Sequence, residues 1–256
     1  MSAVAQRTEP VLAVDGLCKA FGGVDAVIGV SFRVDAGELV ALIGPNGAGK
    51  TTCFNLVNGQ LAPDAGSIAL MGRHVEGLPP RAIARRGVGR TFQVAATFAS
   101  MTVRENVQMA LIARDNAQGA VASRASELSR KEADALLDRV RMTRFADQGC
   151  ATLAYGDAKR VELALALACR PRLLLMDEPT AGMSARSRGR LMDLAVSLAR
   201  EENIAVLFTE HDMDIVFGHA DRVIVLDRGR IIAEGAPAAI RADLRVQAVY
   251  LGTDEG

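Results

Sequence analysis

A nine-residue stretch rich in glycine, residues 44–52, constrains this chain more than any other part of its sequence. It reads Gly-Pro-Asn-Gly-Ala-Gly-Lys-Thr-Thr and satisfies the spacing G-x-x-x-x-G-K-[ST]. The glycines allow a tight turn in which successive backbone N–H groups point inward at a phosphate. Residues 38–43 (ELVALI) predict a short buried strand before the turn, and a helix is expected to begin at Gly49 or Lys50. A helix N-terminus placed there predicts an anion site.

Two side chains of this stretch can act on the phosphates of a nucleotide. Lys50 can reach the β- and γ-phosphates, and the Thr51 hydroxyl can ligate Mg²⁺. A chance match in a glycine-rich turn is the alternative, and the flanking strand and helix argue against it. The other predicted nucleotide-binding residues of the loop are Gly44, Asn46, Gly47, Ala48, Gly49 and Thr52.

Length and composition exclude several classes of protein. The 256 residues suffice for one large domain or two modest ones, and half of them are hydrophobic, enough for a sizeable core. The 30 basic and 30 acidic residues balance, so no global charge attracts nucleic acid or an anionic membrane. Aromatic residues make up 4% and Trp is absent, which argues against base stacking. We therefore expect no nucleic-acid partner.

The cysteines and the apolar segments bear on the compartment. The four cysteines form no C-x-x-C pair, which favours a reducing compartment and argues against structural zinc or a disulfide framework. The N-terminus lacks the apolar segment of a signal peptide, and no apolar run approaches the ~20 residues of a membrane span. We expect a protein that is soluble by itself and acts on membranes only through a partner.

Sequence patterning predicts an α/β fold. Residues 102–147 are expected to be helical, with capping-box spacing at Thr102–Glu105 and residues 116–126 as the least ordered part. Strands alternating with helices after residue 155 predict a parallel sheet covered on both faces. Strands are expected at 11–14, 30–34, 68–71, 88–92, 173–176, 204–208 and 223–226; turns at 19–23 and 64–67; helices at 81–86, 157–169 and 187–200; and a hairpin turn at 228–229 into 231–233.

A pair of acids follows the apolar run at 173–176. Asp177 ends the predicted strand beside the phosphate loop, where a carboxylate can hold Mg²⁺ directly or through water. Glu178 points elsewhere, toward the position of an attacking water, and could act as a general base. The alternative is an acidic strand end without a role.

Four further features leave alternatives open. Gln93 could ligate Mg²⁺ or be a surface glutamine. His211 follows a strand at the carboxyl edge of the sheet, where ligands bind in open α/β folds; it could bond a γ-phosphate or be structural. Residues 153–157 (LAYGD) open a second helix whose N-terminus could receive an anion. Four arginines, Arg81, Arg85, Arg86 and Arg90, form either a solvated helix face or a surface for an acidic partner.

Together these segments resemble the ATP-binding subunit of an ABC transporter, over nearly the whole chain. The resemblance implies a Walker A at Gly44–Thr52, a Q-loop at Gln93, a signature at Leu153–Asp157, a Walker B at Leu173–Asp177, a catalytic Glu178 and a switch His211. It also implies a P-loop NTPase core with a mainly parallel sheet, an N-terminal antiparallel β subdomain and an inserted α-helical subdomain. The expected boundaries are 1–93 and 155–256 for the core and 94–154 for the helices.

Within that family the chain is most similar to the ATPases of branched-chain amino acid uptake. The similar segments are 21–23 (FGG), 90–93 (RTFQ), 101–107 (MTVRENV), 210–213 (EHDM) and 246–252 (VQAVYLG). Urea and amide uptake ATPases and the lipopolysaccharide-export ATPase share much of this pattern, and a partner subunit that binds but does not hydrolyse nucleotide is a further alternative. Soluble ATPases of translation or DNA repair would have tandem cassettes or long insertions, which this chain lacks, and a phosphotransferase would lack the signature.

The resemblance assigns roles to particular residues. Two subunits would sandwich two ATP molecules head to tail. Phe21 would stack on adenine, while Tyr155 and Gly156 would contact nucleotide. Lys50, Glu178 and His211 would be catalytic, and Thr51, Gln93 and Asp177 would serve Mg²⁺. The implied partners are a second ATPase subunit, identical or not, membrane permease subunits and, indirectly, a periplasmic solute-binding protein, with the chain peripheral at the cytoplasmic face of the inner membrane.

The signature departs from the family's usual Leu-Ser-Gly-Gly-Gln. Ala154 replaces the serine whose hydroxyl contacts the γ-phosphate held by the opposite subunit, and Tyr155 and Asp157 replace the first Gly and the Gln. Losing one charge-assisted hydrogen bond costs about 1.5–3 kcal/mol. After the Walker B, Ser184 stands where the family often has Asp. We infer from these changes an asymmetric heterodimer.

Overall fold

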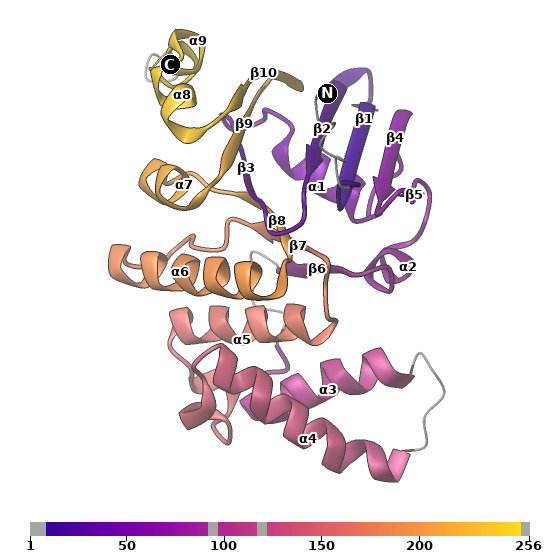
Figure 1. Cartoon of the computed structure of the whole chain (residues 1–256), viewed down its shortest axis with the longest axis vertical. Coiled ribbons are helices and arrows are strands. Elements are labelled where there is room, and N and C mark those ends of the chain that lie inside the picture. The colour runs from indigo at the N-terminus through magenta and orange to yellow at the C-terminus, as the bar shows by residue number, and fades with distance from the viewer. Residues whose placement is uncertain (1–8, 92–96, 117–121, 252–256) are drawn as a thin grey trace, which may run out of the picture.

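The computed structural model describes residues 9–91, 97–116 and 122–251 (Figure 1). Gln93 lies outside these ranges, so its expected roles toward Mg²⁺ and nucleotide stay predictions. Within the described ranges, no helix combines the length and the apolar character that crossing a membrane requires.

A six-stranded sheet forms the centre of the molecule, with the strand order β10-β9-β3-β8-β7-β6. Neighbouring strands are parallel except β10, which forms an antiparallel hairpin with β9. The strands are β3 (Leu39–Ile43), β6 (Val88–Thr91), β7 (Leu173–Asp177), β8 (Ala205–Thr209), β9 (Arg222–Asp227) and β10 (Arg230–Gly235). The predicted parallel sheet and hairpin are confirmed.

The sheet buries both of its faces, as its continuous apolar runs predict. In β3, Val40 and Leu42 pack with α1 (Lys50–Val57) and the second sheet. Ala41 and Ile43 alternate with them and join the cluster on the opposite face. That cluster includes residues of α5 (Tyr155–Ala168) and α6 (Ala185–Glu202).

The second sheet is antiparallel, in the order β2-β1-β4-β5. Its strands are β1 (Leu12–Phe21), β2 (Val24–Val34), β4 (Ala65–Leu70) and β5 (Arg73–His74). The strands predicted at 11–14 and 30–34 are shorter than β1 and β2 as observed. Residues 19–23 and 64–67, predicted as turns, lie partly in strands. The β1–β2 pairing shifts register after Val14, near Gly16 and Gly29, which both have positive φ. Such bulges interrupt the alternation on which the prediction depends.

The inserted helices α3 (Val103–Asn116) and α4 (Ala122–Arg139) pack on α5, which lies between them and α6 in Figure 1. The capping box is confirmed: Thr102 N donates to Glu105 Oε2 at 2.7 Å, and Glu105 N donates to Thr102 Oγ1 at 3.2 Å. Within the segment expected to be least ordered, residues 122–126 begin α4, and 117–121 lie outside the described ranges. The remaining helices are α2 (Pro80–Ala84), α7 (Met213–His219), α8 (Pro237–Ala242) and α9 (Leu244–Leu251).

Candidate active site

The glycine-rich loop joins β3 to α1, as predicted. Two of its glycines have no room for a side chain. A Cβ at Gly44 (φ 152°) would approach the carbonyl oxygen of Leu226 to well under 3.0 Å, and one at Gly49 (φ 103°) would do the same to that of Ala26. Positive φ is also unfavourable for other residues. The loop therefore packs closely against the backbone of β9 and β2, and only glycine fits at these two positions.

The N-terminus of α1 is open to an anion. Gly49 is its N-cap and has no side chain to accept bonds from the first N–H groups, and no acidic residue occupies the first turn. The first backbone N–H groups of a helix lack intrahelical partners and carry partial positive charge. An anion is therefore the ligand that this helix end favours.

Lys50 lies inside the loop, 7% exposed. Its Nζ donates to the carbonyl oxygens of Gly44 at 2.6 Å and Pro45 at 3.0 Å. Burial lowers the pKa of Lys50, and the nearby carboxylates of Glu178 and Asp177 oppose that effect. The Lys50 ammonium thus lies within electrostatic reach of both acids that the sequence singles out.

Asp177 ends β7 directly opposite Thr209 at the end of β8. Thr209 Oγ1 donates to Asp177 Oδ1 at 2.8 Å, and Arg90 donates from Nη2 to Oδ2 at 3.3 Å. The strand expected at 88–92 is confirmed as β6, so the alternative that places all four arginines on one helix face does not hold for Arg90. Arg90 lies on β6, beside β7, and its side chain turns toward the acid because β6 and β7 end at the same sheet edge.

Glu178 and His211 meet at the same edge, with Glu178 Oε1 2.7 Å from His211 Nε2. Glu178 adopts φ 46°, a left-handed conformation that costs a non-glycine residue about 1–2 kcal/mol. That backbone turn directs the carboxylate away from the course of β7. The structure therefore brings together the two acids, Lys50 and His211, from three strand ends.

Phe21 and the loop residues lie near one another. Phe21 ends β1, is 47% exposed, and has Lys19 Nζ 5.7 Å from its ring centroid. It pairs with Val24 at the hairpin tip, two residues before Ala26, which abuts Gly49. Asn46, Gly47 and Thr51 are exposed around the same loop. These positions are open to a ligand.

Tyr155 and Gly156 are not brought to the glycine-rich loop. They begin α5, and their neighbours are Gly182 and Met183, in the loop between β7 and α6. Tyr155 is 46% exposed. The second helix N-terminus is therefore presented on a different surface of the same chain. Its N-cap, Ala154, offers no side-chain hydrogen bond.

Sequence reasoning missed three residues at this edge: Arg90, Thr209 and Glu210. Thr209 and Glu210 hold the backbone around Glu178 through hydrogen bonds. Their signal was present, because they follow the apolar run of β8 as Asp177 follows that of β7. Without the strand register, nothing distinguished them from ordinary strand-end polar residues.

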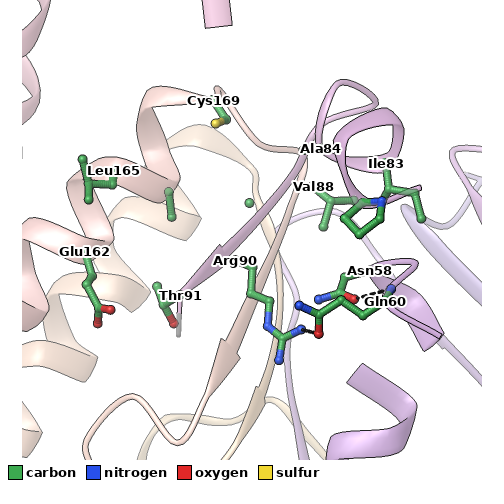
Figure 2. A pocket seen from close by; sticks show the side chains of 13 residues that line it. Asn58, Gln60, Ile83, Ala84, Val88, Arg90, Thr91, Glu162, Leu165 and Cys169 are labelled. Atoms are coloured by element: carbon green, nitrogen blue, oxygen red, sulfur yellow. Dashed lines mark hydrogen bonds between the residues drawn. The ribbon is translucent and has the colours of Figure 1, made fainter. Parts of the chain in front are cut away.

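A cavity of about 300 Å³ lies between β6, α2 and α5 (Figure 2). Its wall is largely apolar and includes Ile83, Val88 and Leu165. Arg90 reaches along one side and donates to Gln60 Oε1 at 3.0 Å. Since the same guanidinium contacts Asp177, one side chain links this cavity to the acidic edge.

Comparison with known proteins identifies the family of this chain. The family model "ABC transporter" matches residues 27–181, which contain the glycine-rich loop, Asp177 and Glu178. The chain belongs to the ABC transporter family. A second family model, "Branched-chain amino acid ATP-binding cassette transporter", matches residues 230–256. ATP binding and hydrolysis by this ABC ATPase follow from membership.

Relatives of this ABC ATPase match its sequence over nearly its full length. It is 40% identical to the high-affinity branched-chain amino acid transport ATP-binding protein BraF of Pseudomonas aeruginosa, covering 96% of this chain and 99% of that one. It is 35% identical to the lipopolysaccharide export system ATP-binding protein LptB of Escherichia coli, covering 95% and 98%. A solved ATP-binding cassette in its ADP conformation matches with TM-score 0.82 and 27% identity, covering 95% of this chain and 99% of that one.

Proposed function

We propose that this ABC ATPase energises an importer of branched-chain or related amino acids. The similarity to BraF and the match of residues 230–256 to a branched-chain cassette family support that solute class. Lipopolysaccharide export is a second candidate, favoured by the 35% identity to LptB. Urea or amide uptake fits the sequence pattern as well. The C-terminal match favours amino acids.

The observation that carries the proposed chemistry is the 2.7 Å pair of Glu178 and His211 beside the buried Lys50. Lys50 and the loop N–H groups would bind the β- and γ-phosphates. Glu178 would take the proton of the attacking water as the water oxygen bonds to the γ-phosphorus, while the bond from that phosphorus to the bridging oxygen breaks and ADP leaves. His211 would orient the Glu178 carboxylate and bond the γ-phosphate. Phosphoryl transfer of this kind depends mainly on positioning and charge neutralisation. Phe21 would stack on the adenine.

The donor set fits Mg²⁺. No cluster of three or more His, Cys, Asp or Glu side chains in the described ranges could cage a metal ion. Mg²⁺ instead prefers one or two protein oxygens completed by phosphates and water. Thr51 and Asp177 would supply these oxygens, Asp177 through water because both of its oxygens already accept bonds. Bound there, the ion would neutralise phosphate charge.

The separation of α5 from the glycine-rich loop supports a head-to-tail dimer. Tyr155, Gly156 and the α5 N-terminus would complete the nucleotide site of a second ATPase subunit. Ala154 would make the site to which it contributes the weaker one, which favours a partner of different sequence. A solved cassette bound to ADP and Pi is dimeric; it is 26% identical, with TM-score 0.76, covering 88% of this chain and 98% of that one.

The cavity in Figure 2 suits a permease. Its apolar wall adjoins a groove of about 900 Å³ lined by Arg81, Arg85 and other arginines. An amphipathic cytoplasmic helix of the permease, with acidic residues on its flank, would match both surfaces in polarity and charge. Such docking would place the chain peripherally at the cytoplasmic face of the inner membrane, with a periplasmic solute-binding protein acting indirectly.

The decisive test is Glu178→Gln in the full chain. We expect Mg-ATP affinity within about twofold of the original and phosphate release reduced by about 100-fold or more, the usual contribution of a general base. Glu201→Gln, on the exposed face of α6, is the matched control and should leave both unchanged. Hydrolysis that survives Glu178→Gln would contradict the mechanism. ATP-driven uptake of leucine, but not urea, by vesicles holding the assembled transporter would test the solute.

A further inference from the structure

The two residues before His211 bracket Glu178 with hydrogen bonds from both sides. Thr209 is 1% exposed. Its Oγ1 accepts a bond from the backbone N–H of Glu178 at 3.0 Å and donates to Asp177 Oδ1 at 2.8 Å. One buried hydroxyl therefore fixes the carboxylate of Asp177 and the backbone of Glu178 together.

Glu210 fastens the chain just beyond Glu178. It is 4% exposed. Its Oε1 accepts from the backbone N–H of Thr180 at 2.9 Å and from Thr180 Oγ1 at 2.6 Å, and its Oε2 accepts from the backbone N–H of His211 at 3.3 Å. Among the described residues Glu210 forms no ion pair, so neutral donors alone compensate this buried carboxylate. Burying a carboxylate is costly unless it is hydrogen-bonded in this way.

Between these two anchors lies the left-handed backbone of Glu178, φ 46°. A strained conformation persists only where its surroundings determine it from several sides. Thr209 holds the residue at its N–H, and Glu210 holds the chain two residues later. If either anchor is released, the backbone can relax, and the Glu178 carboxylate then turns away from His211.

We propose that Thr209 and Glu210 form a clamp, with Thr180 as its attachment point, that positions Glu178 for attack on ATP. The inference rests on the proposed role of Glu178 as the base. Thr209 and Glu210 act as positioning residues, since their hydrogen bonds go to the two acids, to Thr180 and to the backbone of His211. The clamp also ties the end of β7, which carries Glu178, to the end of β8, which carries His211.

The first test is Thr209→Val, which keeps the side-chain shape and removes the hydroxyl, compared with Thr209→Ser, which restores it. We expect Thr209→Val to lower kcat by about 10- to 100-fold, the effect of misplacing a catalytic group by about 1 Å. The Kd for Mg-ATP should stay within twofold, and Thr209→Ser should recover kcat to within about threefold. A structural defect would instead weaken ATP binding and lower the unfolding temperature without rescue by serine.

The second test is Thr180→Val alone and combined with Thr209→Val. Residues that act as one unit give non-additive losses. We therefore expect the double variant to lose little more kcat than Thr209→Val alone. Losses that multiply, or an unchanged kcat in Thr209→Val, would overturn the clamp. If Glu178→Gln still hydrolyses ATP, the proposed base fails instead, so the two failures are distinguishable.

Discussion

Replacing Gly49 by Ala should damage the glycine-rich loop more than replacing Gly47, although both residues have positive φ. Gly49 has φ 103° and Gly47 has φ 79°. The added methyl group of Gly49→Ala would meet the Ala26 carbonyl oxygen at well under 3.0 Å, whereas nothing lies within 4 Å of the one at Gly47. Both variants thus carry backbone strain, but only Gly49→Ala adds steric overlap with the Ala26 carbonyl oxygen.

The magnitudes follow from these two effects. Left-handed strain costs each variant about 1–2 kcal/mol, and forced overlap with backbone adds about 1–3 kcal/mol to Gly49→Ala alone. A difference near 2 kcal/mol corresponds to about 4–8 °C in Tm for a chain of this size. Because the overlap displaces the start of α1, Gly49→Ala should also weaken Mg-ATP binding.

Urea unfolding without nucleotide measures the stability difference, because the exposed Gly47 position then meets no ligand. Thermal scans over a range of Mg-ATP concentrations give the affinity, since a ligand raises stability by RT ln(1 + [L]/Kd). Equal loss of stability in the two variants would refute the close packing of Gly49 on β2. A Gly49→Ala variant as stable as the original would refute it as well.

Three further predictions concern charge and capping. The Arg114 guanidinium lowers the pKa of Glu132 to about 2, so this carboxylate should stabilise the fold above pH 4.5 and lose that effect as the pH falls toward 2. Glu132→Gln should therefore cost about 1–2 kcal/mol of unfolding free energy at pH 7, discounted for partial exposure. The urea unfolding curves of the variant and the original should converge in acid, and a stability difference that does not change with pH would contradict the ion pair. Asp212 caps α7 by accepting hydrogen bonds from Asp214 N and Ile215 N. Asp212→Ala should cost about 1 kcal/mol of unfolding free energy, and Asp212→Asn much less. Equal losses of stability in urea unfolding of the two variants would exclude the cap. Ala154→Ser should add a cap to α5 worth about 1 kcal/mol and raise ATP turnover by the assembled transporter; unchanged turnover would argue against a weakened site.

Much of this site could be predicted because its residues follow short patterns that local chemistry explains. The glycine spacing of residues 44–52 predicts a phosphate turn, and an apolar run ending in Asp177 and Glu178 predicts acids at a sheet edge. The contact of Arg90 with Asp177 could not be predicted in the same way, since the strand expected at 88–92 does not by itself say that it pairs with β7. The lengths of β1 and β2 were missed because bulges near Gly16 and Gly29 hide the alternation.

The sequence by itself determined the phosphate loop, the alternation of strands with helices that gives a parallel sheet, and the identities of the two acids and the histidine. Glycine tolerance and apolar periodicity are local properties, so the sequence alone carries them. Only the tertiary structure decided that Glu178 turns left-handed, that Thr209 and Glu210 hold it, and that Arg90 contacts Asp177. These outcomes depend on which strand ends lie side by side, and strand register arises from contacts between residues far apart in the chain.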